Sequence, residues 1–264
     1  MLSRSALVLS PHQDDETLGC GGTIALKRQA GAEVTVVFLM DGTRSHVPLI
    51  EPAELAALRH AEACAAAARL EVDADHVLFL DFPEGQLGRF VDEAATRLAE
   101  ILARTNPDEL FIPAAAEPHK EHAAANRVAR LAIERAGRAF TVYEYPVWCW
   151  YHWPNVPLPL SRRVIGSSRL RYEMPRVMRN TRLMSFGAGI HRDFPDRLAI
   201  EEVVAIKRAA LEEHRSQMTR LRSTPKWATL ADVGGGEWLE SFFGRQERFK
   251  RYMHGGGGPT DGTG

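Results

Sequence analysis

Apolar runs and segments of helical periodicity alternate along the first 145 residues of the chain. The run at Val34–Met40, VTVVFLM, is continuous and rich in β-branched residues, which is typical of a strand buried on both faces of a parallel sheet. Shorter runs predict further strands at residues 6–9, 76–80, 109–113 and 140–145. Helices are predicted between them at residues 17–30, 51–70, 91–104 and about 119–136. This order predicts an α/β fold with a mostly parallel sheet and right-handed crossovers.

The remainder of the chain is less regular. Residues 199–214 (AIEEVVAIKRAALEEH) predict another helix, and residues 238–252 predict a final amphipathic segment. We expect one domain over residues 1–254 with an elaboration at about 147–197, followed by a disordered glycine-rich tail at 255–264.

Titratable side chains crowd the loop that follows the first predicted strand. Residues 11–16 (PHQDDE) place one imidazole and three carboxylates where open α/β sheets bind ligands. Charges packed so closely repel one another unless a cation or a bound proton compensates, and imidazole with carboxylate is a common partial ligand set for zinc. We therefore interpret the cluster as part of a metal site. The alternative, in which Asp14, Asp15 and Glu16 only cap the helix and complement its dipole, stays open.

A second cluster follows the fourth predicted strand. His119 and His122 are three residues apart at the start of a predicted helix, and this spacing puts both on one helix face. Because strands one and four are expected to end at the same edge of the sheet, these histidines should meet residues 12–15. A histidine pair there strengthens the metal interpretation.

Three motifs together resemble the LmbE-like/PIG-L family of zinc-dependent N-deacetylases. Residues 10–22 (SPHQDDETLGCGG) resemble its first motif, usually written PHPDDE, with Gln13 in place of the second proline. The HKEH sequence at 119–122 resembles H-x-D-H, and here Glu121 and Glu117 stand where the family more often has aspartates. Residues 207–217 (KRAALEEHRSQ) resemble the closing signature K-x-x-A-L-x-x-H-x-S-Q.

The resemblance implies an LmbE-like, Rossmann-type three-layer fold. It also implies hydrolysis of an N-acetyl or other N-acyl group on an amino sugar or its conjugate, which gives acetate and a free amine. By the same resemblance Zn²⁺ is held by His12, Asp15 and His122, Asp14 is the general base, and His119, if protonated, stabilises the oxyanion. Fe²⁺ is an alternative in a reducing cytoplasm, because nitrogen and oxygen ligands discriminate weakly between these metals.

Two other function classes stay open. A metal-dependent phosphoesterase also uses histidines and carboxylates, although two-metal sites usually need more carboxylates than these motifs supply. A catalytically silent sugar-binding module is the non-enzymatic alternative, but a binding protein has no need of a base such as Asp14 beside the ligands.

The elaboration has a composition that bears on the substrate. Residues 148–153 contain three tryptophans and a tyrosine between prolines, too broken for a helix, and these rings either stack on a sugar or pack in the core. Residues 161–197 hold nine arginines against three acidic residues. We interpret them as a contact for an anionic group on the aglycone of an amino-sugar substrate, or for another subunit of a homo-oligomer; a solvated surface is the alternative.

Composition excludes several other partners. The net charge of the 264 residues is -1, so no basic field favours nucleic acid or an anionic membrane. The chain has neither an apolar run of the roughly 18 residues that span a bilayer nor a recognisable signal peptide, so a cytoplasmic location is expected. Cys20, Cys64 and Cys149 are an odd number without a C-x-x-C pair, so neither a disulfide framework nor a zinc ribbon is supported, and Cys20 is expected to be a small buried core residue.

Overall fold

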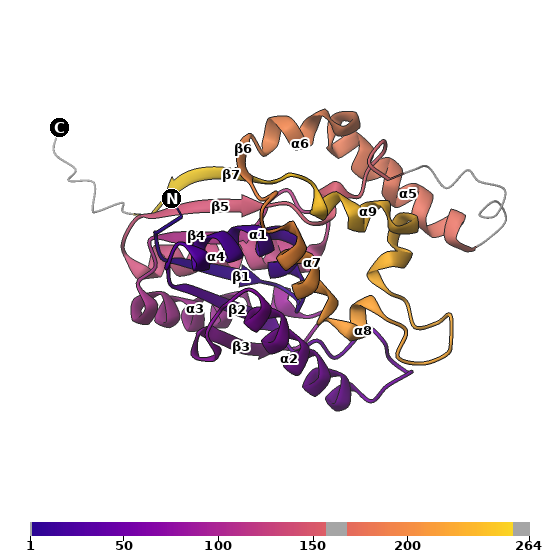
Figure 1. Cartoon of the computed structure of the whole chain (residues 1–264), viewed down its shortest axis with the longest axis horizontal. Coiled ribbons are helices and arrows are strands. Elements are labelled where there is room, and N and C mark those ends of the chain that lie inside the picture. Colours follow the sequence, from indigo (N-terminus) through magenta and orange to yellow (C-terminus); the bar gives the residue numbers. More distant parts are fainter. Residues whose placement is uncertain (1, 157–167, 256–264) are drawn as a thin grey trace.

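The computed structural model describes residues 2–156 and 168–255, and its centre is a seven-stranded sheet in the order β3-β2-β1-β4-β5-β7-β6 (Figure 1). The strands are β1 (Ala6–Ser10), β2 (Val34–Met40), β3 (Val77–Phe82), β4 (Glu109–Pro113), β5 (Phe140–Tyr145), β6 (Asp196–Ala199) and β7 (Gln246–His254). The first five are parallel, whereas β7 is antiparallel to both β5 and β6. The predicted mostly parallel α/β sheet is therefore confirmed.

Helices cover both faces of this sheet and make three layers. They are α1 (Asp15–Gln29), α2 (Pro52–Arg69), α3 (Val91–Thr105), α4 (Lys120–Ala136), α5 (Ser168–Leu183), α6 (Ala188–Asp193), α7 (Val204–Glu212), α8 (Arg215–Met218) and α9 (Glu237–Glu240). Val8 and Val36 pack in one core with residues of α1, α2 and α7, whereas their neighbours Leu7 and Val37 pack in a second core with α3 and α4. Alternate side chains of each buried strand thus pack in different apolar cores, one on each face of the sheet, as is usual for a parallel sheet.

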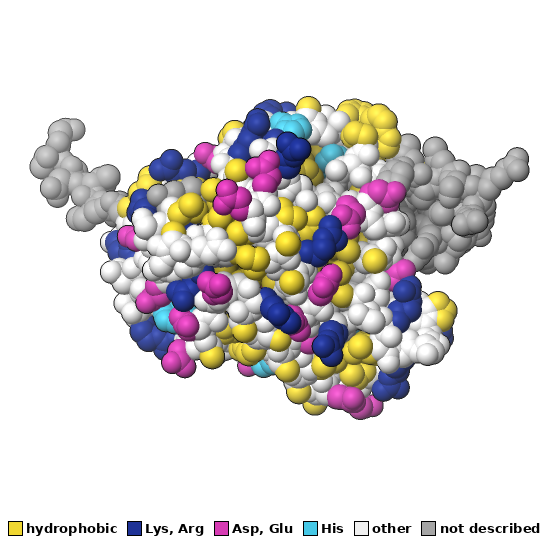
Figure 2. Space-filling model, in the orientation of Figure 1, with side chains coloured by type: hydrophobic (Ala, Val, Ile, Leu, Met, Phe, Trp, Pro, Cys, Tyr) yellow, Lys and Arg dark blue, Asp and Glu magenta, His cyan; other side chains and the backbone are white. Residues whose placement is uncertain are grey.

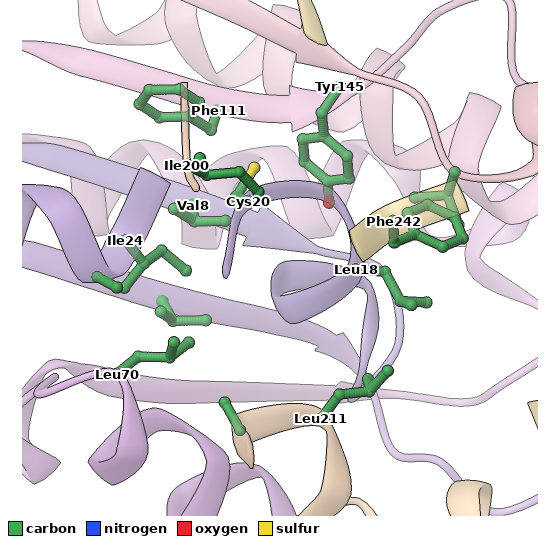
Figure 3. Close-up of a cluster of buried hydrophobic side chains, with 14 of the residues drawn as sticks. Val8, Leu18, Cys20, Ile24, Leu70, Phe111, Tyr145, Ile200, Leu211 and Phe242 are labelled. Carbon is green, nitrogen blue, oxygen red and sulfur yellow. The ribbon is translucent and has the colours of Figure 1, made fainter. Parts of the chain in front are cut away.

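The start of α1 is packed tightly against β5 (Figure 3). Gly19 lets the ring of Tyr145 approach so closely that a Cβ at this position would lie 2.2 Å from its Cδ2. The Tyr145 hydroxyl donates a hydrogen bond to the Leu9 carbonyl at 2.8 Å, which ties β5 to the end of β1. Cys20 is fully buried in the same core, as predicted.

Two predicted elements differ in the structure. The helix expected at 199–214 begins only at Val204, because Ala199 ends β6 and the Ile200 amide donates to the Arg245 carbonyl at 3.0 Å. Pairing of β6 with β7 outweighs the helical propensity of this stretch. The amphipathic segment at 238–252 divides between α9 and β7. Of the elaboration and the tail, residues 157–167 and 256–264 lie outside the described part of the chain.

The loops after β1 and β4 meet at the point where the strand order reverses. These strands are neighbours, with Leu7 opposite Leu110 and Val8 opposite Phe111. Because α1 and α4 then leave toward opposite faces of the sheet, the two loops separate and leave the crevice in which such folds bind ligands. In Figure 1 the arrow of β5 points toward the end of the molecule where α5 and α9 lie.

The surface is mixed in charge. Figure 2 shows basic and acidic side chains interspersed over one face of the molecule, in keeping with the net charge of -1. Within residues 2–156 and 168–255, no helix has the length and apolar character needed to cross a membrane.

Candidate active site

The three predicted ligand side chains converge in the crevice. Asp15 Oδ2 lies 3.0 Å from His12 Nδ1 and 3.2 Å from His122 Nε2, and one donor atom from each residue lies within 4.8 Å of the others. Asp15 and His122 are buried, whereas 14% of the His12 side chain is exposed. The cluster therefore has one open side, which a catalytic metal site requires.

Local structure sets these positions. Asp15 is the first residue of α1, two positions earlier than the predicted helix start, and its Oδ2 accepts a hydrogen bond from the His12 amide at 3.0 Å. Gln13 anchors the same loop by donating to the Met40 carbonyl at 2.6 Å. His122 lies in the first turn of α4, and His119 is the residue that precedes this helix.

The donor set fits a metal cation. Both ring nitrogens of His122 are buried without a hydrogen-bond partner, although Asp15 Oδ2 is near. Burial alone would lower the pKa of His12, but its hydrogen bonds to the carboxylates of Asp15 and Glu121 outweigh burial and raise the pKa to about 10. A positive charge is thus favoured among these side chains. A metal would supply that charge and would also bind a ring nitrogen of His122 that has no hydrogen-bond partner.

Glutamates stand behind both histidines. Glu121 Oε2 lies 3.3 Å from His12 Nε2, and Glu117 Oε2 lies 3.6 Å from His122 Nδ1. In each case the carboxylate faces the ring nitrogen turned away from Asp15, an arrangement that orients histidine ligands and raises their basicity. The added methylene of each glutamate, compared with the aspartates more usual in the motif, does not prevent this contact.

Glu117 also ties the metal cluster to the aromatic segment. Its two oxygens accept hydrogen bonds from the backbone amides of Val147 at 2.7 Å, Trp148 at 2.9 Å and Cys149 at 3.3 Å. These bonds hold the 3₁₀ turn at Trp148–Trp150 beside α4. As predicted, this aromatic stretch is not an α-helix.

Asp14 is buried beside the ligands but has a different environment. It occupies the N-cap position of α1, but its side chain makes no capping hydrogen bond. Its backbone φ of 148° is one that non-glycine residues rarely adopt, which indicates local strain. Burial, reinforced by the charge of Asp15, raises the pKa of Asp14 to about 7. A carboxyl group with this pKa can accept and return a proton near neutral pH.

His119 lies next to the cluster as a neutral ring. Its centroid is 5.5 Å from that of His12 and 5.1 Å from that of His122. Burial, together with the charge of His122, lowers the pKa of His119 to about 3. With a pKa this low, the ring is uncharged near neutral pH and offers a single N–H donor.

Residues of the closing motif, 207–217, contact residues of the first motif, 10–22. His214 Nε2 lies 3.0 Å from Glu16 Oε1, and Lys207 Nζ donates to the Leu18 carbonyl at 2.8 Å. These contacts hold the start of α1, which carries Asp15. The third motif is therefore a buried polar scaffold for the metal loop.

Sequence reasoning missed two buried charges on α2. Arg59 Nη2 lies 3.7 Å from Asp14 Oδ2 and donates to the Gln13 carbonyl at 2.8 Å. Glu62 accepts hydrogen bonds from the amide and hydroxyl of Ser216 at 2.7 and 2.6 Å. Both lie on the helix face of the buried Leu55, four and seven residues after it. In the sequence, the available signal for such buried charges was the position of charged residues on the apolar face of a predicted helix.

Comparison with known proteins identifies the family. Residues 7–133 match the sequence profile of the GlcNAc-PI de-N-acetylase (PIG-L) family. A 1D-myo-inositol 2-acetamido-2-deoxy-alpha-D-glucopyranoside deacetylase from Streptomyces avermitilis is 30% identical over 204 residues, which cover 65% of this chain and 67% of that protein. The chain belongs to the PIG-L family.

Two further comparisons define the extent of the similarity. A deacetylase of the same name from Mycobacterium sp. (strain KMS) is 37% identical over 154 residues, so the match spans 49% of this chain and 50% of that protein. The N,N'-diacetylchitobiose deacetylase structure from Pyrococcus horikoshii matches with a TM-score of 0.59 at 20% identity, over 94% of this chain and 84% of that one. The second likeness confirms the expected LmbE-like fold.

Proposed function

We propose that the protein is a metal-dependent hydrolase that removes an N-acetyl or other N-acyl group from an amino sugar or amino-sugar conjugate. The observation that carries the proposal is the buried carboxyl group of Asp14, which has a pKa of about 7 and adjoins the His12, Asp15 and His122 cluster. A proton acceptor beside a donor set is what amide hydrolysis needs. The names of the PIG-L relatives, which are deacetylases of acetamido sugars, point to the same bond.

Each side chain has a defined part in this reaction. Zinc held by His12, Asp15 and His122 would polarise the amide carbonyl and acidify the attacking water, and Fe²⁺ is the alternative ion in a reducing cytoplasm. Asp14 takes the water proton and returns it to the departing amine, because amines leave poorly as anions. His119 donates its N–H to the oxygen that becomes negative when water adds to the carbonyl.

The test is release of a free amine from N-acetylglucosamine conjugates by the purified protein, with and without a chelator. The same preparations are assayed with a phosphate ester, which would be the substrate of a phosphoesterase. We expect amine release that a chelator abolishes and that added zinc restores. Phosphate release instead, or sugar binding without turnover of any N-acyl sugar, would contradict the proposal.

Metal analysis tests the ligand set separately. We expect about one equivalent of zinc per chain, the stoichiometry of a catalytic zinc site. A variant that combines alanine substitutions at all three proposed ligands should lose it: His12→Ala, Asp15→Ala and His122→Ala. Full occupancy in this variant would show that the ion binds elsewhere.

A further inference from the structure

A pocket lies between α6 and the strands β5 and β7, beside the loop that follows β4 (Figure 1). Its space of about 330 Å³ is in the range of sites that hold a small molecule. The charged residues that line it are Glu144, Arg192, Asp193 and Lys250, and the other described lining residues are alanines, a phenylalanine and a proline. None of the proposed metal ligands lines this pocket, so a molecule bound here would occupy a second site.

The charges of this pocket divide into a paired and an unpaired set. Arg192 donates to both carboxylate oxygens of Asp193, from Nε at 2.6 Å and from Nη2 at 3.0 Å, so these two residues neutralise each other. Glu144 and Lys250 are directly opposite each other in the antiparallel pairing of β5 with β7, which puts their side chains on one face of the sheet. They nevertheless form no salt bridge with each other. The pocket therefore presents one unpaired negative and one unpaired positive group.

The Glu144 carboxylate has one oxygen without a hydrogen-bond partner. Only 3% of the residue is exposed, although it lines the pocket. Its Oε1 accepts hydrogen bonds from Asn126 Nδ2 at 3.0 Å and from the Tyr252 hydroxyl at 2.9 Å. Its Oε2 accepts none from residues 2–156 or 168–255. Because a buried carboxylate is costly unless it is paired and hydrogen-bonded, a cationic N–H donor in the pocket would stabilise this oxygen.

Lys250 offers the opposite charge at the same pocket. Its side chain is exposed, and in the described part of the chain its ammonium group makes neither a salt bridge nor a hydrogen bond. A ligand of one sign would be attracted by Glu144 or Lys250 and repelled by the other. A ligand that carries both signs would be attracted by both. The charges of the pocket thus favour a zwitterion over a simple anion or cation.

We propose that this pocket binds a small zwitterion of the amino-acid class, with its ammonium group on Glu144 and its carboxylate on Lys250. Directly opposed Cα atoms of neighbouring antiparallel strands are only about 4.5–5.5 Å apart, so ligand charges separated by a few bonds can reach both residues. Phe194 and Pro195 give the pocket an apolar wall for the hydrocarbon side chain of the ligand. The inference does not depend on the proposed function, because none of these residues belongs to the proposed reaction.

The experiment is calorimetric titration of the purified protein with L-leucine and with its two half-analogues. 4-Methylpentanoate is leucine without the amine, and 3-methylbutylamine is leucine without the carboxylate. Lys250→Met removes the ammonium group and keeps much of the apolar stem. Glu144→Gln removes the negative charge and keeps an acceptor oxygen at the Oε1 position. The matched control is Arg251→Met, because Arg251 is exposed at the next position of β7 and does not line the pocket.

We expect the wild-type protein to bind leucine at least about tenfold more tightly than either half-analogue, the scale of one charge-assisted hydrogen bond. Lys250→Met should bind leucine no better than 3-methylbutylamine, and Glu144→Gln should bind it no better than 4-methylpentanoate. Arg251→Met should keep the wild-type preference. No binding of leucine, equal binding of a half-analogue, or an unchanged preference in Lys250→Met would overturn the proposal. Because Lys250 is exposed, its variant should fold even if Glu144→Gln does not.

A second titration separates this pocket from the candidate metal site, because an amino acid can also chelate a metal ion. It uses the variant with alanine at His12, Asp15 and His122, which should bind leucine as tightly as the wild-type protein does. Loss of leucine binding in this variant, together with its retention in Lys250→Met, would place the amino acid on the metal and refute the pocket. Since the titrations measure binding alone, their outcome does not depend on whether the protein hydrolyses an N-acyl sugar.

Discussion

Replacement of Glu117 by alanine is the sharpest test of how the fold supports the candidate metal site. The side chain is fully buried and accepts hydrogen bonds from three backbone amides, of Val147, Trp148 and Cys149. A buried amide left without a partner costs about 1–3 kcal/mol. Glu117→Ala should therefore reduce the free energy of unfolding by about 3 kcal/mol or more, which in a chain of this size lowers Tm by roughly 6–12 °C.

Glu117→Gln separates the two roles of the carboxylate. Its Oε1 accepts the bonds from Val147 and Cys149, whereas Oε2 accepts the bond from Trp148 and faces His122. A glutamine amide oxygen at the Oε1 position keeps two of these three bonds, so the loss of stability should be about one third of that in the alanine variant. The negative charge beside His122 is lost in both variants, and zinc affinity should fall about tenfold in each.

Thermal unfolding with a chelator measures stability without metal, and competition with a chromophoric chelator measures zinc affinity. Glu100→Ala is the control, because Glu100 is an exposed residue of α3. It should change neither quantity. If Glu117→Ala kept both the wild-type Tm and the wild-type zinc affinity, the view that this carboxylate holds the aromatic segment and orients His122 would be wrong.

Three further predictions concern single side chains. Asp14→Asn should retain zinc and lower kcat by at least about 100-fold, as expected when a general base is removed; loss of zinc in parallel, by metal analysis, would make Asp14 a ligand instead. His119→Ala should also retain zinc and lower kcat by about 100- to 1000-fold, the cost of losing an oxyanion donor, and a rate within a few-fold of wild type would exclude this role. Burial alone would lower the pKa of His214, but Glu16 outweighs it and raises the pKa. The stability that this pair contributes is therefore complete below the ordinary histidine pKa of about 6.5 and is lost as pH rises through the raised value. The Tm advantage of wild type over His214→Gln, measured with a chelator, should accordingly shrink from about pH 6 to pH 9, and a growing advantage would contradict the ion pair.

The parallel half of the sheet could be predicted from the sequence because its information is local. Val34–Met40 is a strand in the structure with the predicted bounds, since a continuous β-branched run of this length is typical of a strand buried on both faces of a sheet. The same holds for Glu109–Pro113 and Phe140–Tyr145. Once strands alternate with helices, handedness and neighbour order bring residues 12–15 close to His119 and His122. The candidate ligands were therefore within reach of sequence reasoning.

Elements that depend on distant partners could not be found in this way. Residues 199–203 have helical propensity, but β7, which begins more than 40 residues later, draws Ala199 into a strand. The sequence places Arg59 and Glu62 on the face of Leu55, but only the structure identifies Asp14 and Ser216 as their partners. Propensity acts over a few residues, whereas pairing and burial act across the whole chain and prevail where the two disagree.

The sequence by itself determined which ionisable groups stand at the ends of β1 and β4, and only the tertiary structure decided their protonation states and supports. His119 is neutral because it is buried beside His122 and His12, and the pKa of Asp14 is raised to about 7 because Asp14 is buried beside Asp15. In the sequence, Arg176 and Arg179 are two of nine arginines between residues 161 and 197. In the structure, α5 places both of them at one pocket with Trp148. The free energy of a charge depends on its solvent exposure and on every neighbour within a few ångströms, and the linear sequence specifies neither.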